Sequence, residues 1–74
     1  MRDPAASGTI LSILAKAEVE GRTLRQRLAL QGFRMSLVAF YAMMARMEDE
    51  GTVSSRDVEE EIDGIRLRVR YYRH

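Results

Sequence analysis

The chain has 74 residues and a formal net charge of +1, and it contains no cysteine and a single histidine, His74. A domain of this size buries a modest share of its surface and gains stability from disulfides, metal ions or self-association. The composition excludes disulfides and thiolate metal sites, and one histidine does not build a metal centre. We therefore expect one domain with no cofactor and no metal ion, in which self-association supplies any extra stability.

Hydrophobic residues make up 46% of the chain and charged residues 31%, a balance that indicates a folded domain. No stretch reaches the roughly 18 consecutive apolar residues of a membrane span. The N-terminal segment MRDPAASG also lacks the apolar core of a signal peptide. We expect a cytoplasmic protein with no membrane partner.

Arginine dominates the cations, because Lys16 is the only lysine. Arginine forms bidentate hydrogen bonds with phosphate, guanine edges or carboxylates, and lysine does not. The bias is therefore compatible with binding to nucleic acid. A GC-rich genome produces the same bias without any function, so both explanations stay open.

The N-terminal residues predict an arm followed by a helix. The residue before a proline is disfavoured in the helical conformation, so Asp3-Pro4 predicts no helix before Thr9. We expect residues 1–8 to form a flexible arm and residues 9–74 to form the domain. From Thr9 onward, apolar residues recur at helical spacing and predict a first helix with a buried face: Ile10, Ile13, Leu14 and Ala17.

A second helix is predicted to begin at Thr23. The preceding string EVEGR is interpreted as a connector with Gly21 as its flexible point. Thr23 opens the string Thr-Leu-Arg-Gln, which fits a capping box. Gln31-Gly32 ends the helix, because glycine suits the left-handed residue that follows a helix.

The third helix is predicted over residues 36–50. Ser36 is a favourable N-cap, and Gly51 stops the helix. Residues 37–45 contain no charge, and a helix that is apolar all round is usually buried on more than one side. The expected buried stripe contains Leu37, Phe40, Met43, Met44 and Met47, and the opposite face carries Val38, Ala42, Ala45 and Asp49.

The remaining residues predict a β-hairpin. Asp63-Gly64 between two strand patterns favours a two-residue type I′ turn, which pairs Ile62 with Ile65 and fixes the register. One face then carries three pairs of opposite charge, each contributing a few tenths to about 1 kcal/mol. These pairs are Glu61 with Arg66, Glu59 with Arg68, and Asp57 with Arg70. We expect them to engage the hairpin arginines in structural pairing.

Three helices followed by a two-stranded antiparallel wing define an α+β chain of the winged helix-turn-helix type. Several strings resemble the winged-helix domain of PadR-type transcriptional regulators. Residues 10–15 and 21–24 resemble the family's first helix and connector, and residues 36–48 with Gly51 resemble its recognition helix. Arg70-Tyr71-Tyr72 is similar to the end of its wing. Ala39 and Ala42 depart from a family Thr and Pro, and this wing is more acidic.

The resemblance implies a sequence-specific, DNA-binding transcriptional regulator that binds double-stranded DNA as a homodimer. The helix over residues 36–50 would be the recognition helix in the major groove. Family members dimerise through further C-terminal helices, whereas this sequence ends at His74, so we expect another surface to be used. Tyr41 and Arg46 would face DNA, with Ser36 and Val38 near the backbone. Four arginines flank the helix-turn-helix and could grip phosphates: Arg22, Arg25, Arg27 and Arg34.

Each of these assignments has an alternative. Tyr41 could be a half-buried packing residue, and Arg46 could pair with the acids of residues 48–50. The uncharged run over residues 37–45 also fits a protein-interaction winged helix that reads no DNA, binding a partner or a second copy. Catalysis has little support, because the acids of the string EEEID alternate between two faces of a strand, so we do not expect an enzyme.

Overall fold

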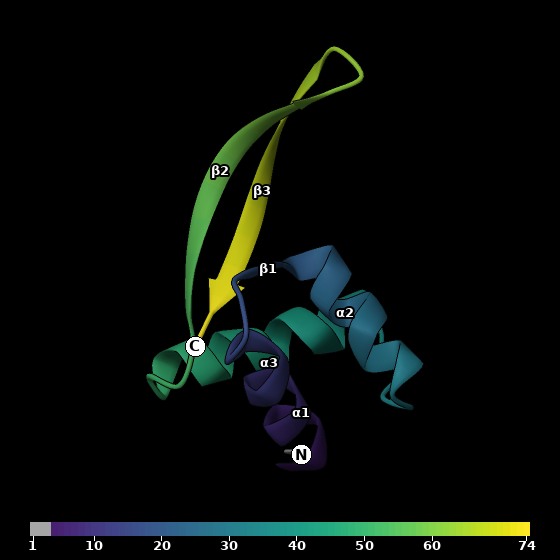
Figure 1. Cartoon of the computed structure of the whole chain (residues 1–74), viewed down its shortest axis with the longest axis vertical. Helices are drawn as coiled ribbons and strands as arrows, with labels where there is room; N and C mark the ends of the chain where they lie inside the picture. Colours follow the sequence, from purple (N-terminus) through teal and green to yellow (C-terminus); the bar gives the residue numbers. More distant parts are fainter. Residues whose placement is uncertain (1–3) are drawn as a thin grey trace.

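The computed structural model describes residues 4–74 and has an α+β architecture (Figure 1). The elements are α1 (Pro4–Leu14), β1 (Val19–Glu20), α2 (Gly21–Leu30), α3 (Leu37–Asp49), β2 (Ser54–Ile62) and β3 (Ile65–Arg73). The strands form one antiparallel sheet in the order β1-β3-β2. The helices pack together at the base of the hairpin, which extends away from them (Figure 1).

Helix α1 begins earlier than the sequence indicated. It starts at Pro4 and runs through Gly8, so the prediction of a flexible arm is wrong for residues 4–8. Residues 1–3 of that predicted arm lie outside the described residues. Proline is well tolerated in the first turn of a helix, where its missing N–H would have no partner. The added turn extends the core, because Ala6 is fully buried in the same cluster as Ile10.

The sheet has three strands where two were predicted. Val19 and Glu20 lie opposite Tyr72 and Tyr71 of β3, so part of the segment interpreted as a connector is strand β1. Val19 is buried, and a two-residue strand is too short to show an alternating pattern in the sequence. This strand fixes the start of α2 against the base of the hairpin.

Glu20 caps α2, which begins at Gly21 and not at Thr23. The Glu20 carboxylate accepts a hydrogen bond of 3.1 Å from the backbone N–H of Arg22. It also accepts one of 3.3 Å from the Thr23 hydroxyl. The prediction of Thr23 as the capping residue is therefore wrong, because Glu20 already provides the acceptor. The predicted end is confirmed, with Gly32 following the helix at a φ of 94°.

Helix α3 follows the prediction at both ends. The Ser36 side chain accepts a hydrogen bond of 3.1 Å from the backbone N–H of Ala39, and Gly51 after the helix has a φ of 78°. The core contacts of α3 begin at Phe40. Leu37 was expected in the buried stripe but is 50% exposed, because it lies in the first turn, before those contacts begin. The buried residues of α3 are Phe40, Met43, Met44 and Met47.

The hairpin register is the predicted one throughout. Ile62 pairs with Ile65, and Asp63 and Gly64 have φ values of 53° and 78°, as the two turn residues require. The predicted charge pairs are only partly correct. Arg70 contacts Asp57 at 2.9 Å.

Arg66 reaches a diagonal neighbour, Glu59, at 3.8 Å, and not its opposite residue Glu61. Arg68 forms no salt bridge within residues 4–74. Long side chains on one face of a hairpin reach diagonal neighbours as well as direct ones. The prediction that each hairpin arginine pairs with the acid across from it is therefore wrong for Arg66 and Arg68.

Tyr72 joins the hairpin to the helices. Its side chain is almost completely buried, and its ring packs edge-to-face against Phe40 with centroids 6.5 Å apart. A Cβ atom at Gly21 would lie 3.3 Å from the Tyr72 ring and 3.0 Å from the Tyr41 hydroxyl. A larger residue at position 21, the start of α2, would therefore have to displace one of these tyrosines.

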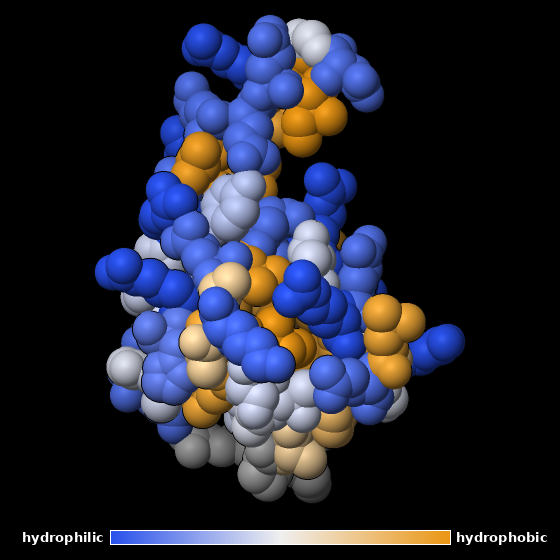
Figure 2. Space-filling model, viewed as in Figure 1, coloured by the Kyte–Doolittle hydropathy of each residue, from blue (hydrophilic) through white to orange (hydrophobic). Residues whose placement is uncertain are grey.

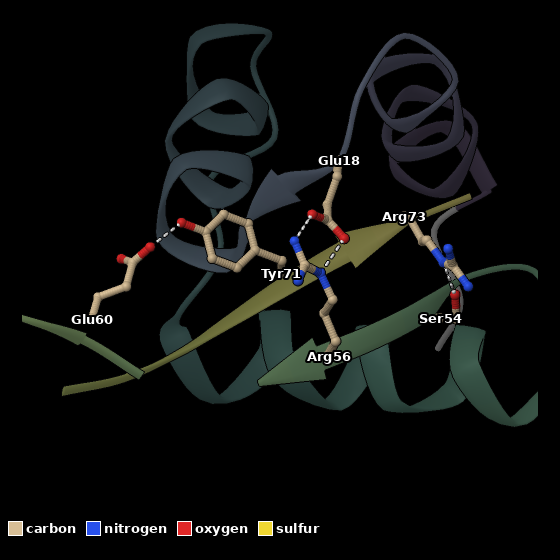
Figure 3. Close-up of polar contacts among 6 residues, drawn as sticks. All are labelled: Glu18, Ser54, Arg56, Glu60, Tyr71 and Arg73. Atoms are coloured by element: carbon tan, nitrogen blue, oxygen red, sulfur yellow. Dashed lines mark hydrogen bonds and ion pairs between the residues drawn. The ribbon is translucent and has the colours of Figure 1, made fainter. Parts of the chain in front are cut away.

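Polar contacts at the base of the hairpin link it to the segment before β1 (Figure 3). The Arg56 guanidinium donates hydrogen bonds of 2.9 and 2.6 Å to the Glu18 carboxylate and lies 5.6 Å from the Tyr71 ring centroid. The Tyr71 hydroxyl donates a 2.6 Å hydrogen bond to Glu60, which raises the pKa of Tyr71. The Arg56 hydrogen bonds lower the pKa of Glu18.

Alanine substitutions at two helical glycines should have opposite effects. Gly8 of α1 has open space at its Cβ position, so Gly8→Ala should raise the free energy of unfolding by about 0.5–1 kcal/mol. Gly21→Ala should lower it, since the new methyl group presses against two tyrosines. Urea unfolding followed by circular dichroism measures both. A gain in stability for Gly21→Ala equal to that of Gly8→Ala would contradict the packing described.

The free energy of unfolding should fall at acidic pH, because two carboxylates that accept hydrogen bonds from arginines become protonated. Hydrogen bonds from Arg56 and Arg70 lower the pKa values of Glu18 and Asp57 in the folded state. Their contribution is complete above the unfolded pKa values of about 4 and is lost as the pH falls through the lower folded values. Glu18→Gln and Asp57→Asn should flatten the acid limb of unfolding free energy against pH. Glu61→Gln is the control, since Glu61 forms no salt bridge within residues 4–74, and an equal flattening by this variant would contradict the assignment.

Candidate nucleic-acid interface

Helix α3 exposes the face opposite its buried stripe, and this face carries no charge over residues 38–45. Val38 is 81% exposed, and Ala42 and Ala45 continue this face along the helix. Tyr41 lies at its edge with a side chain 36% exposed. We call Val38, Tyr41, Ala42 and Ala45 the α3 face. Small side chains at its centre let another molecule approach the helix closely.

Two arginines border the α3 face on the side of the turn between α2 and α3. Arg34 from the turn and Arg46 from α3 line a hollow of about 440 Å³ together with Ala39 and Ala42. Both arginines are exposed, and neither forms a salt bridge within the described residues 4–74. The alternative in which Arg46 pairs with the acids that follow it is thus not observed among these residues. We call Arg34 and Arg46 the turn arginines.

Three arginines border the α3 face on the side of the hairpin. Arg22 from α2 and Arg68 and Arg70 from β3 line a second hollow of about 440 Å³ together with Tyr41. We call these three the hairpin-side arginines. Arg70 is engaged by Asp57 at 2.9 Å, and Arg22 lies 3.6 Å from Glu20.

Among the three hairpin-side arginines, Arg68 has a guanidinium group with no acidic partner among residues 4–74. It forms no salt bridge among residues 4–74, although its charge contributes to lowering the pKa of Asp57. Sequence reasoning missed this placement of the hairpin arginines beside Tyr41. The available signal was strand alternation: Arg66, Arg68 and Arg70 share a face with Tyr72, and burial of an aromatic residue on that face turns it toward the helices.

Tyr41 is both packed and exposed. Its ring meets Phe40 edge-to-face with centroids 5.1 Å apart, and its hydroxyl lies close to Gly21 at the start of α2. Part of the ring packs on the domain, and the exposed part lies between the α3 face and the hairpin-side arginines.

Arg25 joins α2 to the turn that leads into α3. Its Nε and Nη2 atoms donate hydrogen bonds of 3.2 and 3.1 Å to the carbonyl oxygen of Met35, ten residues later. The side chain is partly buried, and the carbonyl belongs to the turn that leads into α3. Arg25 thus sets the position of α3 relative to α2, and we leave it out of the candidate interface.

Arg27 does not join the other predicted residues. It lines hollows whose described walls come from α1, α2, the segment between α1 and α2, and the hairpin. Of the predicted site residues, the structure therefore brings together Arg34, Ser36, Val38, Tyr41 and Arg46 on α3 and the turn before it.

Comparison with known proteins found no matching family model, no matching curated protein and no matching solved structure. Within residues 4–74, no helix is both long and apolar enough to cross a membrane. The same residues contain no group of three or more histidine, cysteine or acidic side chains placed to hold a metal ion.

Arg25→Lys should lower the free energy of unfolding by about 1–2 kcal/mol, because a lysine does not donate the paired hydrogen bonds that hold the Met35 carbonyl. Arg27→Lys is a matched control on the same helix. Arg27 is exposed and has no salt bridge within the described chain, so its replacement should change stability by less than about 0.5 kcal/mol. Equal effects of the two variants in urea unfolding would show that Arg25 has no role in holding the turn.

Proposed function

We propose that this chain is a winged helix-turn-helix protein that binds double-stranded DNA with α3 as its recognition helix. One observation carries the proposal: the uncharged α3 face lies between two groups of arginines, the turn arginines and the hairpin-side arginines. The resemblance of residues 10–72 to PadR-type regulators supports the same function. Transcriptional regulation is the role that we propose for such binding.

The major groove of DNA offers a counterpart to this arrangement. The major groove is about 12 Å wide and admits an α-helix, and a phosphate backbone borders it on each side. A helix with small side chains approaches the base edges closely, while arginines on both of its sides meet the two backbones. Arg34, Arg22 and Arg68 would bind phosphates, which fixes position without reading sequence.

Residues of α3 itself would contact the base edges. The Arg46 guanidinium can donate two hydrogen bonds to a guanine, and the exposed Val38 side chain suits a thymine methyl group. Ser36 caps α3, so the backbone N–H groups of its first turn stand at the helix end that favours a phosphate. Tyr41 would contact the backbone beside the hairpin-side arginines.

A second candidate function is a protein-interaction module. The observation that favours it is the apolar character of the α3 face, in which Leu37 is 50% and Val38 81% exposed. The net charge of only +1 also gives weak long-range attraction to DNA. In this candidate a partner protein would cover α3, and the arginines would only border the contact.

Arginine substitutions should separate base contacts from phosphate contacts on a duplex selected from a random library. Arg46→Ala should weaken binding to the selected duplex by about 1–3 kcal/mol and relax its sequence preference. Arg34→Ala and Arg68→Ala should weaken binding to all sequences and each reduce the salt slope by about 1.

Arg73→Ala removes the same charge at the base of the hairpin, where Arg73 bonds Ser54, and serves as the control. Equal affinity of Arg46→Ala and the unmodified protein for the selected duplex would overturn the role given to Arg46. Failure of the unmodified protein to bind any duplex at low ionic strength would favour the second candidate function.

A further inference from the structure

A second surface contains no residue of α3. It begins at a hollow of about 590 Å³ between the ends of α1 and α2, lined by Ile13, Ala17 and Leu30 with two cations, Lys16 and Arg27. We call this hollow the helix groove. Leu30 is 88% exposed there, more than any other large hydrophobic side chain among residues 5–74. The helix groove is thus apolar at its centre and positively charged at its margin.

One face of the far end of the hairpin carries acidic residues and no arginine. Ile62, Ile65 and Leu67 lie on one face of the hairpin and are 40%, 60% and 42% exposed. Two acidic residues adjoin them, Glu60 on the same face and Asp63 in the turn, whereas Arg66 and Arg68 lie on the opposite face. We call these five residues, three apolar and two acidic, the hairpin tip. It is an apolar surface with an acidic margin, and it complements the helix groove in both properties.

The two regions belong to one continuous surface. A hollow of about 370 Å³ lies between them, and its walls include Ala17 and Arg27 of the helix groove and Ile62 of the hairpin tip. Figure 2 shows the molecule hollowed between the hairpin and the helices, with hydrophobic side chains exposed at the tip. The surface therefore has an acidic apolar end and a basic apolar end.

We propose that this surface is the contact between two copies of the chain, with the hairpin tip of each copy on the helix groove of the other. In a dimer with a two-fold axis, the same surface of each copy faces the other in the opposite direction. The acidic end of each copy therefore meets the basic end of the other, and the two equivalent contacts form together. A two-stranded ribbon is marginally stable in water unless another element covers a face. The second copy would provide that cover for the exposed end of the hairpin.

The contact is independent of DNA binding. It uses α1, α2 and the hairpin tip, whereas the α3 face and the turn arginines take no part. Association can therefore be measured on the protein alone, and its outcome does not depend on whether the proposed function holds.

Sedimentation equilibrium of two matched variants tests the contact. Leu30→Glu and Val38→Glu each place an acid at a highly exposed apolar position, the first in the helix groove and the second on the α3 face. Leu30→Glu should raise the dimer dissociation constant about tenfold or more, and Val38→Glu should leave it unchanged. A dimer weakened by Val38→Glu and not by Leu30→Glu would overturn the proposal, as would an unmodified chain that remains monomeric at millimolar concentration.

A charge exchange tests the pairing of opposite ends. Lys16→Glu and Glu60→Lys should each weaken self-association, because both contacts of the dimer then join like charges. An equimolar mixture should associate more tightly than either variant alone, since a dimer of the two different chains restores opposite charges in both contacts. Circular dichroism confirms that each variant is folded. A mixture that associates no better than the separate variants would contradict the proposed pairing of hairpin tip with helix groove.

Discussion

Burial of Tyr72 is the constraint on which the arrangement of this chain depends. The ring fills the space between Phe40 of α3 and Gly21 of α2, and its backbone pairs with Val19 on one side and Ser55 on the other. One residue thus fixes both helices relative to the sheet. Because side chains alternate along a strand, burying Tyr72 also turns Arg70 and Arg68 toward Tyr41. The position of the hairpin-side arginines is a consequence of core packing.

The arginines divide into structural and available groups. Arg25, Arg56 and Arg70 hold a turn carbonyl, the Glu18 carboxylate and the Asp57 carboxylate, respectively. Arg34, Arg46 and Arg68 have no salt bridge within residues 4–74 and surround the uncharged α3 face. A near-neutral chain can in this way present local positive charge, since most of its acids lie on the hairpin or at the C-terminal end of α3. The proposal of DNA binding rests on this distribution and not on the total charge.

Local chemistry made much of the fold predictable. Ser36, Gly51 and Asp63-Gly64 act through their own neighbours, and the helix cap, helix end and hairpin register that they predict are confirmed. The features that were not predicted from the sequence depend on contacts between residues far apart in the chain. Strand β1 exists because β3 lies beside it, and Arg25 is engaged by a carbonyl ten residues away. The candidate site was predicted in part for the same reason: α3 shows its own exposed face, but only the fold brings Arg68 to it.

Nuclear magnetic resonance of the protein titrated with a DNA duplex at low salt tests the central claim most directly. Side-chain Nε–H signals of arginine and backbone amides report contact residue by residue. Binding through α3 predicts shifts for Arg34, Arg46, Arg68 and the amides of residues 36–46, with little change at Arg56, which Glu18 holds. Shifts confined to Arg27 and the hairpin tip, or none at all, would contradict α3 as the surface that meets DNA.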